Sequence, residues 1–172
     1  MSTPTKKMVI IEGCDGSGKS TLARALARSL EIPVAERVVT SEDGPPSKSD
    51  LIKWTYRELA DPMPKIYDRF PIYSDPIYAR LLKREHYIGT GMIRHFHETE
   101  TPFLILCDPG FEAVRKGALK EKQLRGVLPN LEAIHAQYRK LPFIDYVYDH
   151  TDDSETLGYN FMLELINDYL EN

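Results

Sequence analysis

The stretch that most constrains this chain is GCDGSGKS at residues 13–20, which fits the pattern G-x-x-x-x-G-K-[ST]. The apolar run MVII at residues 8–11 precedes it and predicts a buried strand. Residues 20–30 follow with leucines and alanines at helical spacing, so a helix should begin inside the motif. A glycine-rich turn between a strand and a helix points backbone N–H groups and the positive end of the helix dipole at one place. The pattern therefore predicts a loop that encloses the phosphates of a nucleotide.

The residue types of this loop suit phosphate chemistry. Glycines let the backbone N–H groups turn inward around phosphate oxygens. Lys19 can reach the β- and γ-phosphates as a point charge, and the hydroxyl of Ser20 can ligate Mg²⁺. We therefore expect ATP as the phosphate donor, with Mg²⁺ as its cofactor. The residues expected to hold the donor are Gly13, Asp15, Gly16, Ser17, Gly18, Lys19, Ser20 and Thr21.

Strand and helix patterns alternate along the rest of the chain. Further strands are expected at residues 34–40, 65–70, 102–110 and 143–151, and further helices at residues 51–60, 76–98, 130–140 and 153–170. This alternation predicts an α/β fold of three layers, in which a five-stranded parallel sheet is flanked by helices. A length of 172 residues suffices for one domain, so residues 1–172 are expected to form a single one. Ligands of such sheets bind beyond the carboxyl ends of the strands.

Composition narrows the kind of partner. The net charge of −4 disfavours a large nucleic-acid footprint, which usually needs a basic surplus. No window approaches the roughly 18 apolar residues of a membrane span, and the apolar run near the start is too short for a signal peptide. We therefore expect a cytoplasmic protein with a small-molecule partner and no membrane span. Cys14 and Cys107 lack the spacing of a metal site and read as small residues at strand ends.

A second group of polar residues follows the strand expected at residues 65–70. Asp68 would lie at the carboxyl end of that strand, beside the Mg²⁺ region, and Arg69 would present a planar guanidinium to a phosphate. A surface Asp-Arg pair without a role in the site is a common alternative interpretation. The phosphate loop earlier in the chain favours instead a role for Asp68 and Arg69 in the site. Phe70 and Tyr78 flank the pair and are candidates to stack on a base.

Residues 115–127 are expected to form a short basic lid. VRKGALKEKQLR at residues 114–125 is the one strongly basic cluster of this acidic chain. Cations that close over a transferring phosphoryl group stabilise its charge, and the planar guanidinium groups of Arg115 and Arg125 suit that task. Gly117 and Gly126 are candidate hinges. A solvated helix face is the alternative interpretation.

Together these motifs resemble the thymidylate kinases, a family of P-loop nucleoside monophosphate kinases. EGCDGSGKST at residues 12–21 is close to that family's E-G-x-D-G-x-G-K-[ST]-T, and DRF at residues 68–70 is similar to its D-R-[YH]. The resemblance implies the P-loop NTPase (nucleotide kinase) fold, Asp68 near Mg²⁺, Arg69 on the acceptor phosphate, and a homodimer. RFPIYSDPIYA at residues 69–79 also resembles a motif of the deoxynucleoside kinases. At residues 38–46 Ser41 replaces an arginine of the thymidylate kinases, and this departure concerns one contact to the acceptor phosphate.

Three functions are compatible with these observations. The first, which we expect, is ATP-dependent phosphoryl transfer to a deoxynucleoside monophosphate (dTMP or a related one), giving the diphosphate. The second is a kinase that acts on a hydroxyl of a deoxynucleoside or of a modified base in DNA, with Glu42 or Asp68 as the general base. The third is a non-catalytic nucleotide-binding switch. It should carry D-x-x-G after the strand that supplies Asp68 and N-K-x-D later in the chain, and neither motif is present there.

For the first function the site residues can be named in advance. The catalytic residues would be Lys19, Asp68, Arg69, Arg115 and Arg125; the metal ligands would be Ser20 and Asp68; and the substrate would contact Glu42, Asp68, Arg69, Phe70 and Tyr78.

Overall fold

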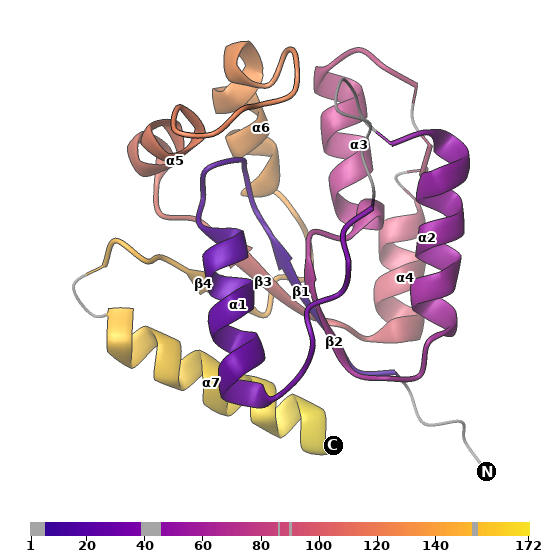
Figure 1. Ribbon diagram of the computed structural model, residues 1–172, viewed down its shortest axis with the longest axis vertical. Helices are drawn as coiled ribbons and strands as arrows, with labels where there is room; N and C mark the ends of the chain where they lie inside the picture. Colours follow the sequence, from indigo (N-terminus) through magenta and orange to yellow (C-terminus); the bar gives the residue numbers. More distant parts are fainter. Residues whose placement is uncertain (1–5, 39–45, 86, 90, 153–154) are drawn as a thin grey trace.

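The computed structural model describes residues 6–38, 46–85, 87–89, 91–152 and 155–172 (Figure 1). Within this part of the chain, four strands form one sheet in the order β2-β1-β3-β4. All three pairings are parallel. The strands are β1 (Met8–Glu12), β2 (Lys65–Asp68), β3 (Phe103–Cys107) and β4 (Tyr146–Tyr148).

Helices cover both faces of the sheet (Figure 1). One face packs against α1 (Lys19–Leu30) and α7 (Glu155–Glu171). The other packs against α2 (Lys48–Ala60), α3 (Pro71–Leu81) and α4 (Met92–Glu100). The remaining elements are α5 (Phe111–Ala118), the 3₁₀ turn η1 (Leu128–Asn130) and α6 (Leu131–Tyr138), which pack with α3 in a third cluster. The expected α/β class, with a parallel sheet between layers of helices, is confirmed.

The central strand β1 shows why the sheet needs helices on both faces. Successive side chains of a strand point to opposite faces. Met8 and Ile10 therefore lie in the core cluster with Trp54 of α2, while Val9 and Ile11 lie in the cluster with α1 and α7. All residues of β1 are buried, as expected of a strand in the middle of a parallel sheet.

The expectation of five strands is wrong, because the described part of the segment expected at residues 34–40, residues 34–38, does not form a strand. Val34 makes one isolated parallel bridge to Ile66 of β2. Beyond it, the carbonyl oxygen of Glu36 accepts a hydrogen bond from Trp54 Nε1 at 2.9 Å instead of pairing with β2. A tryptophan side chain thus takes the place of a backbone partner, and the segment leaves the sheet.

The mostly helical stretch expected at residues 76–98, with a break near Gly89 to Gly91, contains the end of α3 and most of α4. Helix α3 begins earlier than the pattern predicted, because Pro71 suits the first turn, where a backbone N–H group has no partner inside the helix. This early start brings Ser74 and Tyr78 onto one helix that begins close behind Arg69.

Within the described residues, no helix combines the length and the apolar content that crossing a bilayer would require.

Candidate active site

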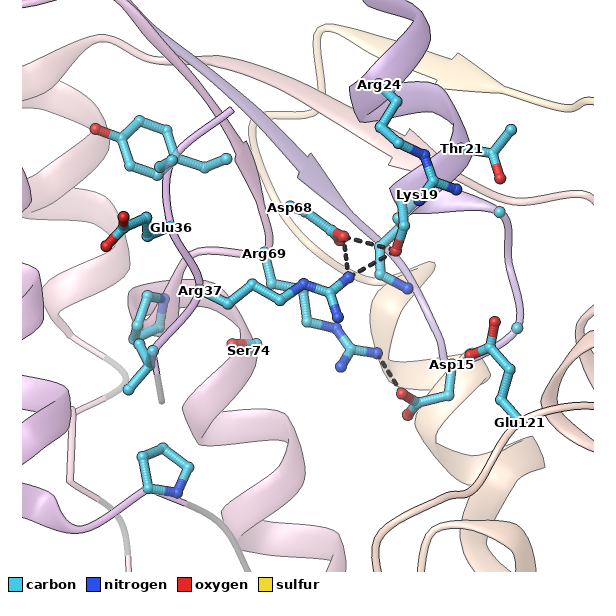
Figure 2. Close-up of a pocket in the computed structure, with 18 of the residues that line it drawn as sticks. Asp15, Lys19, Thr21, Arg24, Glu36, Arg37, Asp68, Arg69, Ser74 and Glu121 are labelled. Atoms are coloured by element: carbon cyan, nitrogen blue, oxygen red, sulfur yellow. Dashed lines mark hydrogen bonds and ion pairs between the residues drawn. The ribbon is translucent and has the colours of Figure 1, made fainter. Parts of the chain in front are cut away.

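A cavity of about 460 Å³ opens at the carboxyl ends of β1 and β2 (Figure 2). Its wall includes the phosphate loop, the coil at residues 35–38, the end of β2 with Asp68 and Arg69, and Gly117 of α5. This is the sheet edge at which the sequence analysis expected a ligand. The cavity gathers segments from widely separated parts of the chain.

The phosphate loop connects β1 to α1 as expected. Gly13, Gly16 and Gly18 all have positive φ, a conformation that favours glycine. Lys19 Nζ donates to the carbonyl oxygen of Cys14 at 2.6 Å and so lies against the loop. Burial, together with the nearby charge of Arg69, lowers the pKa of Lys19 to about 8. An added anion would favour the charged form of this lysine, because opposite charges raise the pKa of an amine.

Gly16 also sets the distance between the loop and α5. A Cβ atom at Gly16 would overlap the backbone of Val114 and Ala118, and a Cβ atom at Gly117 would overlap the carbonyl of Gly16. The two backbones therefore touch through a pair of glycines. Gly117, expected as a lid hinge, lies within helix α5 and serves here as a close contact.

Ser20 and Asp68 meet at the centre of the cavity. Ser20 Oγ donates to Asp68 Oδ2 at 2.7 Å. The guanidinium of Arg37 contacts both: Nη2 donates to Ser20 Oγ at 2.6 Å and forms an ion pair with Asp68 Oδ2. Burial alone would raise the pKa of Asp68, but hydrogen bonds from Arg37 and Ser20 outweigh burial and hold that pKa below its usual value. Asp68 is therefore a carboxylate at neutral pH.

The donor atoms at this point fit Mg²⁺. A hydroxyl oxygen and a carboxylate oxygen are the hard ligands that Mg²⁺ prefers, and Mg²⁺ is usually bound by one or two carboxylates together with substrate phosphates. A larger protein cage is not required, and no group of three His, Cys, Asp or Glu side chains suitable for a metal occurs in the described residues. Asp68 Oδ1 is buried and has no hydrogen-bond partner among the described residues, so the carboxylate meets Ser20 and Arg37 through Oδ2.

Arg69 is fixed on the other side of the loop. Its φ of 72° is unusual for a residue with a side chain, and its backbone N–H donates to the carbonyl of Ile11 at 2.9 Å. The guanidinium donates to Asp15 Oδ1 at 2.9 Å and to the Tyr78 hydroxyl at 2.7 Å. Tyr78 in turn donates to Asp15 Oδ2. Loop, strand end and helix α3 are thus joined by one network of three side chains.

A second cavity, of about 230 Å³, continues from the first beyond Arg69. It shares Asp15 and Arg69 with the first cavity, and Tyr78 and Arg125 also line it. Its wall is mainly apolar and includes Leu82, Tyr87, Leu124 and Val127. On the far side of the phosphate loop, a third cavity of about 450 Å³ lies between Gly18 and the end of β4.

Several expected site residues lie elsewhere. Phe70 is 0% exposed and stacks on Phe96 in the core at 5.1 Å, so it is not available to stack on a base. Arg115 is exposed, pairs with Glu112 at 3.1 Å, and is not among the residues that line these cavities. Thr21 lines the first and third cavities. Glu42 lies outside the described residues.

The sequence analysis missed Arg37. The thymidylate kinase motif has its arginine at the position of Ser41, so the resemblance does not point to Arg37. Arg37 also falls inside the strand pattern expected at residues 34–40, so no local signal marked it as a residue beyond the end of a strand. Glu36 was missed in the same way and also lines the cavity.

A parallel α/β sheet with a phosphate loop between β1 and α1 defines a P-loop nucleotide-binding fold. The chain belongs to the AAA domain family, whose model matches residues 3–109, a range that includes the phosphate loop, Asp68 and Arg69. No curated protein sequence matches the chain. The family thus establishes the nucleotide-binding domain without naming a substrate.

Solved structures with similar folds are kinases and related nucleotide-binding proteins. The YorR protein of Bacillus subtilis, in complex with phosphorylated GDP, has a TM-score of 0.68 and 17% identity over 94% of this chain and 97% of that one. Deoxyadenosine kinase from M. mycoides, with the products dCMP and dCDP, has a TM-score of 0.60 and 14% identity over 95% and 99%. Shikimate kinase from Acinetobacter baumannii has a TM-score of 0.57 and 9% identity over 96% and 95%. At these identities the likeness shows the fold, and the thymidylate kinase family in particular is not among these neighbours.

Proposed function

We propose that this protein transfers the γ-phosphoryl group of ATP to the phosphate of a deoxynucleoside monophosphate, dTMP or a related one, and so forms the diphosphate. The observation that carries the proposal is the position of Arg37 and Arg69, which enter the same cavity as the phosphate loop from the β2 side (Figure 2). A monophosphate is an ionised nucleophile that needs cations and correct placement, not a base. Two guanidinium groups beside the loop supply this requirement.

The reaction follows from the residues that surround the cavity. An oxygen of the acceptor phosphate attacks the γ-phosphorus, the bond from that phosphorus to the β,γ-bridging oxygen breaks, and ADP leaves with the bond's electron pair. Lys19 and the loop amides hold the β- and γ-phosphates, and Arg69 holds the acceptor phosphate. Mg²⁺, held by Ser20 and Asp68, would neutralise charge on the donor phosphates.

The second cavity suits the nucleoside part of the acceptor. It continues directly from Arg69, and its apolar wall offers Tyr78 and Leu82 to a base. Arg125 of the lid lines this cavity, whereas Arg115 is paired with Glu112 outside it and would need the lid to move. The third cavity, beside Gly18, offers Tyr148 and Tyr159 to the base of ATP.

Phosphorylation of a hydroxyl is the second candidate. Its supporting observation is Glu36, a carboxylate that lines the first cavity and could serve as a general base in place of Glu42. However, Glu36 extends to the opposite side of its segment from Arg37 (Figure 2). Asp68, the other candidate base, lies beside the phosphate loop but is engaged by Ser20 and Arg37. Neither carboxylate is therefore placed as a free base, and this favours a phosphate acceptor.

The test is ATP consumption measured with each deoxynucleoside monophosphate and each deoxynucleoside, with product identity checked by chromatography. We expect ADP and a deoxynucleoside diphosphate to appear together in equal amounts. Turnover with deoxynucleosides alone would replace the first candidate by the second. Nucleotide binding without any ADP release above the rate in water would contradict both.

A further inference from the structure

We propose that the side chain of Arg37 alternates between two partners: the Ser20–Asp68 pair, and the phosphate of the acceptor. Occupation of the Ser20–Asp68 pair by the donor's Mg²⁺ would set Arg37 free for the acceptor. The protein would then bind its two substrates with positive coupling, the Mg²⁺-nucleotide favouring the acceptor. The second half of this proposal rests on the proposed function, because it requires a phosphate on the acceptor.

Arg37 and Mg²⁺ need the same two atoms, Ser20 Oγ and Asp68 Oδ2. Arg37 Nη2 contacts Ser20 Oγ at 2.6 Å and is ion-paired with Asp68 Oδ2. Asp68 meets both Ser20 and Arg37 through Oδ2, while Oδ1 is buried and has no hydrogen-bond partner among the described residues, so a metal held by Ser20 Oγ and Asp68 Oδ2 would need the atoms that Arg37 contacts. Mg²⁺ requires its oxygen ligands at about 2.0–2.1 Å, and at that distance a second cation cannot keep hydrogen bonds to the same pair of oxygens.

The side chain of Arg37 can leave the Ser20–Asp68 pair at a low cost in free energy. Its side chain is 66% exposed, whereas that of Asp68 is 5% exposed, so the arginine covers the carboxylate from the solvent side. Because the arginine is so exposed, solvent screens this ion pair and makes it weaker than a buried one. Arg37 also lies in coil, and the neighbouring Glu36 is held through its carbonyl by Trp54. The side chain can therefore swing while the backbone stays in place.

Once released, the guanidinium of Arg37 would lie in the same cavity as that of Arg69. Arg69 is partly buried and held by Asp15 and Tyr78, so its position does not depend on the metal pair. Arg37 extends toward the same central space of the cavity (Figure 2). Once its pair is broken, the charge of Arg37 is unbalanced beside that of Arg69, and a dianionic phosphate between the two restores the balance. Arg37 is thus a positioning residue whose availability depends on the donor side.

The first experiment measures Mg²⁺ and needs no turnover. ATP binding is followed by calorimetry over a range of Mg²⁺ concentrations, without acceptor, for the wild type, Arg37→Gln and Arg24→Gln. Arg24 lines the same cavity and carries the same charge, but its side chain makes no hydrogen bond or ion pair with the side chains of Ser20 and Asp68, whose described partners are each other and Arg37. We expect the half-saturating Mg²⁺ concentration to fall about fivefold in Arg37→Gln, the equivalent of one exposed ion pair, and to change less than twofold in Arg24→Gln.

The second experiment measures the coupling. Binding of dAMP, dCMP, dGMP and dTMP is compared with and without ADP and Mg²⁺, a combination that cannot react. We expect the acceptor to bind the wild type about fivefold more tightly when Mg²⁺ and ADP are present, and we expect Arg37→Gln to lose this gain, since coupling between two ligands is reciprocal. Thermal unfolding of each variant checks that the fold is retained.

The outcomes separate the two proposals. A Mg²⁺ requirement that is equal in Arg37→Gln and Arg24→Gln, with normal binding of a monophosphate to the wild type, overturns the exchange and leaves the proposed function standing. A lowered Mg²⁺ requirement together with no binding of any monophosphate overturns the acceptor half, and the proposed function with it.

Discussion

The donor side and the acceptor side of the cavity are built by different means. The donor side is one contiguous stretch, residues 13–20, whose shape depends on backbone conformation at glycines with positive φ. The acceptor side combines Arg37, Asp68, Arg69 and Tyr78, which come from a coil, the end of a strand and a helix. Its shape depends on ion pairs and hydrogen bonds among side chains.

This difference has a physical consequence. A loop shaped by its backbone is present before any ligand binds and presents N–H groups without rearrangement. A group of arginines paired with carboxylates must break some of those pairs to bind a new anion. Substitutions on the donor side should therefore affect the chemical step, and substitutions on the acceptor side should affect binding of the acceptor.

The largest effect is expected for Lys19→Ala, on the donor side. Loss of a buried cation that contacts charge developing in the transition state should lower kcat by about 10²–10³-fold. The fold should persist, because Lys19 sits at the start of α1 and its main protein contact is the Cys14 carbonyl. Steady-state kinetics and circular dichroism check both statements. Lys53→Ala, at an exposed position of α2, is the matched control, and a kcat near that of the control would remove Lys19 from the proposed mechanism.

Glu12 lies where the two sides meet, and its charge should make stability depend on pH. It ends β1 beside the phosphate loop, and its Oε1 accepts a hydrogen bond from the backbone N–H of Phe70 at 2.6 Å, directly after Arg69. Burial, only partly offset by that hydrogen bond, raises the pKa of Glu12 to about 7 in the folded state. The folded protein therefore holds a proton that the unfolded chain releases at a lower pH.

The sign follows from this difference in pKa. The stabilising contribution of protonated Glu12 is complete below the unfolded pKa of about 4.5 and is lost as the pH rises through about 7. Glu12→Gln keeps an acceptor oxygen for Phe70 and removes the titration. We expect the free energy of unfolding of the wild type, relative to this variant, to fall by about 3 kcal/mol between pH 5 and pH 8. Urea denaturation at the two pH values measures these free energies of unfolding. An equal change in both proteins between pH 5 and pH 8 would contradict the raised pKa of Glu12.

Arg69→Ala is the acceptor-side counterpart of Lys19→Ala. A charged hydrogen bond of this kind is worth about 1.5–3 kcal/mol, so the acceptor KM should rise about 10- to 100-fold while the KM for ATP changes little. Tyr78→Phe, which removes one hydrogen bond to the guanidinium and leaves the charge, should give a smaller rise in the same constant. An equal effect on both substrates would mean that Arg69 supports the loop through Asp15 and not the acceptor.

The same contrast explains what the sequence could predict. The phosphate loop, its flanking strand and helix, and the position of Asp68 beside Ser20 depend on short patterns, and the structure has them as expected. Arg37 could not be placed in this way, because its position depends on Trp54 taking the backbone acceptor that a fifth strand would have used. Phe70 was assigned to a base because it adjoins Arg69, but the left-handed backbone of Arg69 is followed by a turn of the chain into the core. The position of Arg37 and the burial of Phe70 both depend on packing between segments that are distant in the sequence, and local sequence patterns do not encode such packing.

The smallest effect is expected where the donor side meets the lid, at Gly117. A Cβ atom there overlaps the backbone of Gly16, and backbone cannot move aside as cheaply as a flexible side chain. Overpacking of this kind costs about 1–3 kcal/mol, and the better helix propensity of alanine returns up to about 1 kcal/mol. Gly117→Ala should therefore lower the free energy of unfolding by about 1–2 kcal/mol and weaken ATP binding, because the loop must shift. Gly91→Ala, where an added Cβ atom meets nothing within 4 Å, is the control. If Gly117→Ala binds ATP as tightly as Gly91→Ala does, the loop tolerates the displacement, and the donor side is less dependent on its backbone than the comparison with the acceptor side implies.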